Sequence, residues 1–150
     1  MTDFDIQEKL IAHFHTLNTA SGCAFLTDEI TDEEENVIGY GNVSYPNFPF
    51  NMPEDKRFFA LHFLPGTPDA VAIGEEAPTR WEGIFQIDIY TALDYGEDEV
   101  RAKYEAIMEL FKRGTFIDNT VDVNKCYRLT PQEEIDAYKT VVRVEWTADI

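Results

Sequence analysis

The side chains that could act as nucleophiles are few in this 150-residue chain. Ser21 and Ser44 are its two serines, and neither lies in the G-x-S-x-G motif of a nucleophile elbow. Cys23 and Cys126 could each form a thiolate nucleophile beside a histidine. Cys126 lies in a predicted strand and Cys23 among small residues, so we expect both to be buried as small apolar side chains. Their wide separation, without a C-x-x-C motif, is typical of reduced thiols in a cytosolic protein.

Three histidines and 29 acidic residues invite a search for metal sites and acid–base sites. His13 and His15 are two positions apart on a predicted helix, so their side chains diverge and cannot share a metal ion. His62 lies in an apolar strand, where a packed or hydrogen-bonded imidazole is the common outcome. Carboxylate pairs are so numerous that their proximity does not indicate a glycosidase, and the acidic run 28–35 lacks the glycine and terminal glutamate of a calcium loop. We therefore predict no catalytic residues, no metal and no cofactor, and a protein that is not an enzyme.

The charge of the chain restricts its partners. Twelve lysines and arginines oppose the 29 acids, which leaves a formal net charge of −17. Proteins that grip nucleic acids or anionic lipids need clustered cations, so we expect no direct nucleic-acid binding and no membrane docking. No apolar run approaches the roughly 20 residues of a membrane span, and the acidic N-terminus is unlike a signal peptide. A soluble intracellular protein with one domain over residues 1–150 is the resulting expectation.

Apolar periodicity places the elements that must position any site. A helix over 3–17 is predicted from a stripe at helical spacing, with Thr2 and Asp5 as a capping box. The acidic run 28–35 is expected to form a solvated loop. A second helix over 97–112 begins with acids and ends with Lys112, Arg113 and a glycine stop. The predicted strands are 37–45 (bent or at an edge), 57–64, 83–92, 120–128 and 139–147. Along 83–92 the apolar residues alternate with Gln86, Asp88 and Tyr90, so we expect one face of this strand to be buried and the other to be wetter.

This pattern predicts the α+β class: a largely antiparallel or mixed sheet of about four to six strands, with two helices packed on one face. The sixteen residues 65–80 between two confident strands are too many for an ordinary hairpin loop. Prolines and glycines flank an apolar centre there, over 70–73. We expect a long hairpin arm that another subunit covers.

Four motifs follow one another in the middle of the chain. They are Asn47-Phe48-Pro49-Phe50, Leu64-Pro65-Gly66-Thr67-Pro68, Gly83-Ile84-Phe85-Gln86-Ile87-Asp88-Ile89-Tyr90 and Phe111-Lys112-Arg113-Gly114-Thr115. In their order and spacing, over about residues 45–117, they resemble the tail terminator (tail completion) proteins of bacteriophages with long non-contractile tails.

The resemblance implies a structural virion protein, assembled in the host cytoplasm and located at the head-proximal end of the phage tail. Such proteins form hexameric rings that cap the tail tube, end its polymerisation and offer a docking surface to the head–neck connector. The implied partners are other copies of the chain, the major tail tube protein and the connector, while DNA passes through the lumen without specific binding. The candidate interface residues are Asn47, Phe48, Pro49, Phe50, Pro65, Pro68, Val71, Ile73, Arg80 and Trp81.

Alternatives remain open at this point. An acidic inhibitor that mimics DNA and blocks a host nuclease would also explain the charge, and another neck or connector protein would share the structural role. Phe48 and Phe50 could cover the domain's own core instead of an interface. The acidic side chains could line the lumen of a ring or form a solvated outer face.

Overall fold

A curved mixed sheet forms the centre of the structure, a computed structural model that describes residues 2–70, 73–74, 79–94, 96–133 and 137–149. Hydrogen-bonded neighbours follow the order β3-β4-β6-β10-β8-β7, and two short strands pair at the side, β5 with β6 and β9 with β10. The β3–β4 pair is parallel and the other pairs are antiparallel. The strands are β3 (Val43–Ser44), β4 (Phe58–Pro65), β5 (Asp69–Ala70), β6 (Thr79–Thr91), β7 (Phe116–Ile117), β8 (Val121–Arg128), β9 (Gln132–Glu133) and β10 (Tyr138–Asp149).

Side chains alternate along β4, β6 and β10, so one face of the sheet is the apolar core face. The register aligns its residues in rows across the three strands, and most of them are fully buried. The rows are Phe59, Ile89 and Thr140, then Leu61, Ile87 and Val142, then Phe63, Phe85 and Val144.

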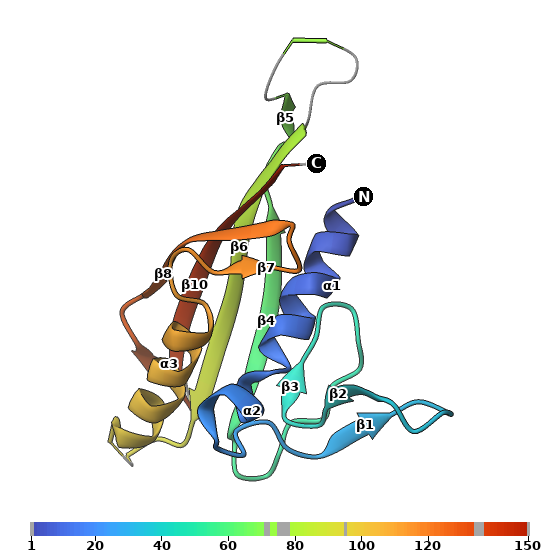
Figure 1. Cartoon of the computed structure of the whole chain (residues 1–150). Helices are drawn as coiled ribbons and strands as arrows, with labels where there is room; N and C mark the ends of the chain where they lie inside the picture. The colour runs from blue at the N-terminus through green and yellow to red at the C-terminus, as the bar shows by residue number, and fades with distance from the viewer. Residues whose placement is uncertain (1, 71–72, 75–78, 95, 134–136, 150) are drawn as a thin grey trace.

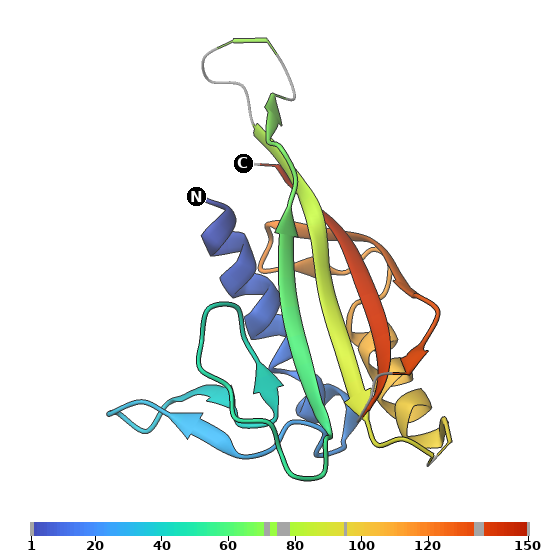
Figure 2. The same ribbon diagram turned by 180° about the vertical axis from the view of Figure 1, so that it is seen from behind.

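The helices lie on this core face, in front of the sheet in Figure 1, while Figure 2 shows β4, β6 and β10 with no helix over their other face. They are α1 (Asp3–Phe14), α2 (Leu17–Ser21) and α3 (Asp98–Leu110). Phe14 at the end of α1 packs edge-on against Phe59, and Phe111 after α3 contacts Phe85. The α+β class, the sheet and the two long helices on one face confirm the predicted fold.

The predicted first helix is shorter than 3–17 because the chain turns after Phe14. The capping box is present, with the Asp5 carboxylate accepting a hydrogen bond from the Thr2 N–H at 2.6 Å. At the other end the Thr16 hydroxyl donates to the His13 carbonyl at 2.7 Å, a local bond that competes with helix continuation. The chain then resumes as α2, which ends at Gly22 in the left-handed conformation (φ 72°).

The acidic run 28–35 contains a strand, which corrects the prediction of a loop throughout. β1 (Glu29–Thr31) pairs antiparallel with β2 (Val37–Tyr40) in a separate two-stranded sheet. The connecting turn closes because the Asp32 carboxylate accepts the backbone N–H groups of Glu34 and Asn36, each at 2.9 Å. The acids of this run are exposed, as predicted.

The described residues of the segment 65–80 extend the hairpin of β4 and β6 as an arm (Figure 1). β5 pairs with the first residues of β6 at its base. Ile73, near the tip, is fully exposed. The predicted arm is therefore present, while residues 71–72 and 75–78, Val71 among them, lie outside the described residues.

Gly83 in the third sequence motif allows an aromatic side chain to reach the core beside the arm. A Cβ atom at this position would lie 2.6 Å from the Leu64 carbonyl oxygen and 2.8 Å from Cζ2 of Trp146. Trp146 is 1% exposed and stacks on Phe63 with ring centroids 5.5 Å apart. The absent side chain is thus a packing requirement of the β4–β6–β10 junction.

We expect Gly83→Ala to lower the free energy of unfolding by about 1–3 kcal/mol, because the added methyl group overpacks a site closed partly by backbone. Urea unfolding of the two proteins measures the difference. Glu82→Ala, at the exposed neighbouring position, is the matched control and should unfold like the wild type. An unchanged midpoint for Gly83→Ala would show that the junction relaxes at no cost.

Candidate interaction surfaces

The arm presents one of the two predicted interface groups. Pro65 and Pro68 are exposed on it. At its base, the Arg80 guanidinium binds both carboxylate oxygens of Asp149 at 2.8 and 2.9 Å, which ties β6 to the end of β10. Trp81 packs against the hydrophobic core. The base of the arm is thus fixed to the sheet, and Ile73 is left in solvent.

The second predicted group, Asn47 to Phe50, divides between the surface and the core. Asn47 adopts a left-handed conformation (φ 51°), which turns the chain. Phe48 is 50% exposed and contacts Tyr45 edge-on. Phe50 instead packs on Phe58 with ring centroids 5.0 Å apart. Phe50 thus covers Phe58 on the helix-free face of the sheet, and Phe48 is left half-exposed.

Phe48 borders an apolar hollow of about 140 Å³ under the β1–β2 hairpin. Its walls come from three segments that are separate in sequence, because β1, β2 and the proline-rich loop after β3 meet there. The lining residues are Ile30, Ile38, Gly39, Tyr45, Pro46 and Phe48. With Ile38 53% exposed, the hollow and its rim form a continuous apolar surface.

His15 and Tyr45 attach this hairpin surface to the helices. The Tyr45 hydroxyl accepts the Tyr40 N–H at 3.0 Å and lies 2.8 Å from Nε2 of His15. In the neutral imidazole that nitrogen can accept the Tyr45 O–H. Burial lowers the pKa of His15 and raises the pKa of Tyr45 to about 12. Both groups are therefore held in their neutral forms.

The helix-free face of the sheet carries a buried polar network. Asp88 on β6 is 1% exposed, with Oδ2 lying 2.9 Å from Nε2 of His62 and 3.7 Å from Nζ of Lys139. Its Oδ1 accepts from Gln86 at 3.0 Å, and Gln86 in turn accepts from Arg143 at 3.1 Å. The sequence predicts that Gln86, Asp88 and Tyr90 lie on the wetter face of β6. For Asp88 this prediction is wrong, because side chains on β4 and β10 cover it.

The candidate chemical groups of the sequence lie apart from one another. Cys23 is exposed, contrary to expectation, because it follows α2 in an open loop. Cys126 is half-buried, and burial raises its thiol pKa to about 12. His13 contacts the Leu110 carbonyl oxygen at 2.9 Å. Among the described residues, no three side chains of His, Cys, Asp or Glu converge as metal ligands would.

The structure thus offers surfaces for contact, and comparison with known proteins agrees. The family model for phage tail terminator proteins matches residues 39–146, more than half of the chain. The chain belongs to the phage tail terminator family. The match includes all four sequence motifs and every predicted interface residue. A structural role in the phage tail, and association with the virion, follow from the family.

Solved structures support the fold. One solved chain aligns over 96% of the terminator and 96% of its own length, with a TM-score of 0.66 and 12% sequence identity. A likeness at that identity shows a shared fold alone. Among curated proteins the search found no match. Within the described residues of the terminator, no helix has the length and apolar character that a membrane crossing needs.

The structure does not bring the two predicted interface groups of the terminator together. The arm projects past one end of β4 and β6, while the loop after β3 lies beside the β1–β2 hairpin (Figure 1). Sequence reasoning missed the apolar hollow and the Asp88 network. The sequence signal for the hollow was the pair Ile30 and Ile38, two isoleucines on either side of an acidic turn. The sequence holds no comparable signal for the burial of Asp88.

The lowered pKa of His15 predicts a pH-dependent stability of the terminator. Its folded-state pKa lies below the ordinary value of 6.5, so the unfolded chain binds a proton that the folded chain does not. The free energy of unfolding should therefore fall as pH decreases through about 6.5. Urea titrations at about pH 7.5 and 5.5 should show a smaller decrease for His15→Gln. Equal decreases in both proteins would contradict this role of His15.

The Asp88 network predicts a second effect on stability. Asp88→Ala removes the carboxylate that His62 and Gln86 contact and that lies 3.7 Å from Nζ of Lys139, and should cost about 2–4 kcal/mol of unfolding free energy. This expected loss of unfolding free energy is smaller than the loss from breaking a fully buried ion pair, because His62 is 49% exposed. Glu145→Ala, on the same face, is the control, because Glu145 forms no ion pair within the described part of the chain. Equal unfolding midpoints of the two variants would argue against the network.

Proposed function

We propose that this protein forms a ring, hexameric as the family resemblance implies, that caps the phage tail tube. The ring ends tube polymerisation at the head-proximal end of the tail and offers a docking surface to the head–neck connector. Its partners are other copies of the chain, the major tail tube protein and the connector. Membership of the terminator family is the observation that carries this proposal.

Two separated apolar surfaces support assembly into a ring. A closed ring needs a heterologous interface, in which one patch of a subunit meets a different patch of the next. The arm exposes Leu64 (47%) and Ile73 (106%), and the hairpin side exposes Ile38 and Phe48. Exposed side chains of this size are typical of surfaces that another protein covers.

The net charge fits a ring through which DNA passes without specific binding. Each copy carries −17, so a lumen surface drawn from such a chain repels the phosphate backbone. The same charge makes the subunits repel one another, and their contacts must supply enough apolar and complementary polar area to exceed that repulsion. Separate subunits that assemble on the tube are consistent with this balance.

Deleting the gene from its phage should give abnormally long tails without heads, because nothing then stops tube growth. Electron microscopy of the lysate measures tail length, and wild-type protein supplied from a plasmid should restore it. Tails of normal length after deletion would move the role of this protein elsewhere.

The same complementation assay tests the arm. Ile73→Asp should leave the unfolding midpoint unchanged, because the side chain is fully exposed in the monomer, yet it should fail to restore tail length. Glu54→Gln, at an exposed position in the loop before β4, is the control and should complement.

A further inference from the structure

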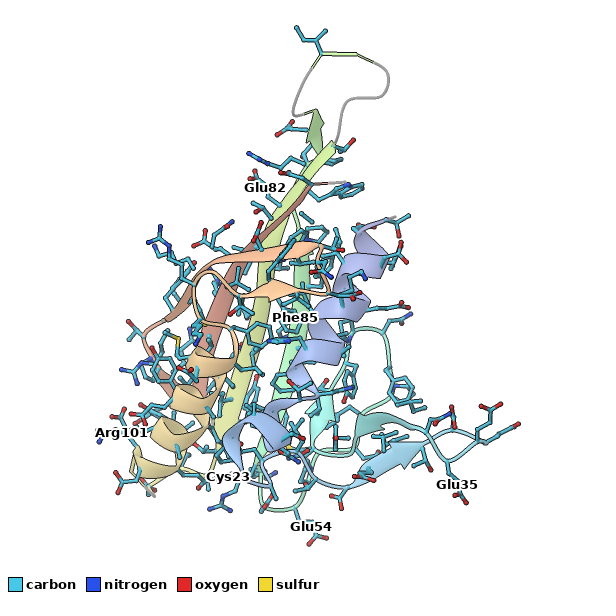
Figure 3. All side chains as sticks on the ribbon, viewed as in Figure 1. Cys23, Glu35, Glu54, Glu82, Phe85 and Arg101 are labelled. Atoms are coloured by element: carbon cyan, nitrogen blue, oxygen red, sulfur yellow. The ribbon has the colours of Figure 1, made fainter. Side chains whose placement is uncertain are left out.

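Residues 32–35 form the acidic turn of the β1–β2 hairpin, in which the Asp32 carboxylate accepts two backbone N–H groups. All four side chains are exposed, and Figure 3 shows Glu35 at the far end of the hairpin, away from the body. Within the described residues none of the four forms an ion pair. The turn also precedes the region that the family model matches, 39–146. The charges of Glu33, Glu34 and Glu35 therefore have no ion-pair partner among the described residues, and they lie outside the family match.

A hollow of about 530 Å³ between α3 and β8 has the opposite character. Lys112, Arg113 and Lys125 lie at its edge, and no carboxylate is among the residues that line it. Lys112 pairs with Glu109 at 3.2 Å, while Arg113 and Lys125 form no ion pair with a described residue. In a chain with 29 acids and 12 bases, three cations around one hollow form a local reversal of charge.

The two features lie on opposite flanks of the molecule. The hairpin extends to one side of the sheet in Figure 1, α3 and β8 lie on the other, and the view from behind in Figure 2 keeps them apart. A hairpin cannot reach the hollow of its own chain, but a neighbouring copy can present it. We propose that the acidic turn of one copy docks into the basic hollow of the next, and so forms the repeating contact of the proposed ring.

Apolar contacts complement the charges in this arrangement. Val37 (42% exposed) and Ile38 (53% exposed) follow the turn on β2. Met108 and Cys126, both half-buried, line the inside of the hollow. In the proposed contact the acidic turn therefore faces the cations of the hollow, and Val37 and Ile38 face Met108 and Cys126. The charges orient the two copies, and the apolar side chains add buried area.

The turn is already ordered for such docking. Two backbone N–H groups bind the Asp32 carboxylate, and Glu35 sits in the left-handed conformation (φ 65°). A preformed turn loses less conformational entropy on binding than a mobile loop. The contact also offsets part of the repulsion between subunits, because it places acids against the cations that the chain does have.

Charge reversal in two variants tests the contact. The hairpin variant carries Glu33→Lys with Glu34→Lys, and leaves Asp32 in place because that side chain closes the turn. The hollow variant carries Arg113→Glu with Lys125→Glu. Each variant alone places side chains of like charge opposite one another at the two replaced positions, so we expect at least about tenfold weaker association between copies.

The decisive sample contains both variants together. A reversed hairpin fits a reversed hollow and a natural hairpin fits a natural hollow, so the two proteins can alternate around a ring with an even number of subunits. In a phage that lacks the gene, each variant alone should give long tails, and co-expression should restore normal length. A general effect of salt on charge interactions would act equally on every copy. It therefore could not make each variant fail alone and the two variants succeed together.

Glu8→Lys with Glu54→Lys is the matched control, because it changes the net charge as much as the hairpin variant does, at exposed sites elsewhere. It should restore tail length as the wild type does. The contact is overturned if either reversed variant restores length alone, if co-expression fails, or if the control fails too. In each case circular dichroism must show folded variants, and milder Glu33→Gln and Arg113→Gln replacements substitute for any that do not fold.

This inference rests on the proposed function, but its failure is distinguishable from failure of that function. If wild-type protein does not restore tail length, the capping role fails while the contact is still measurable. Carbodiimide treatment of mixed heavy- and light-isotope protein should then link glutamates of the turn to Lys112 or Lys125 between copies. Links confined to other sites would overturn the contact, whatever the protein does on the tail.

Discussion

The pairing of β10 with β6 is the interaction on which the rest of the molecule depends. Twelve consecutive residue pairs, from Tyr138 with Thr91 to Asp149 with Arg80, join strands that are distant in sequence. This register decides which side chains face the helices, because a slip of one residue would exchange the two faces of the sheet. It also sets the base of the arm, where Arg80 and Asp149 meet. The arm can therefore project into solvent from a rigid support.

Helices cover only one face of the sheet, but side chains are buried on both faces. The core face carries large apolar side chains under α1 and α3, and it supplies most of the apolar burial. The opposite face has no helix over it, yet Asp88 is buried there among side chains of β4 and β10. A charged group in that position is retained only with partners, and His62, Gln86 and Lys139 provide them.

The strong negative charge of the chain is unevenly distributed, and this matters for assembly. The acidic turn at the end of the hairpin and the cations beside α3 lie on opposite flanks. The docking that we propose between them would combine general repulsion between copies with one complementary contact. Phe48 beside the apolar hollow and Ile73 on the arm remain exposed outside that proposed contact.

The sequence by itself determined the local elements, since these depend on patterns within short stretches. The capping box at Thr2, the alternation of β4 and β6, and the helix at Asp98–Leu110 all follow from residue spacing, and the four ordered motifs identified the family. Tertiary structure alone decided where distant segments meet. Asp88 was predicted to be wet and is buried, because alternation specifies a face but not what covers it. Cys23 was predicted to be buried and is exposed, and β1 formed within an acidic run, because β2 offered it a partner eight residues later. Surfaces made from separate strands and loops depend on register and packing, which no local pattern in the sequence records.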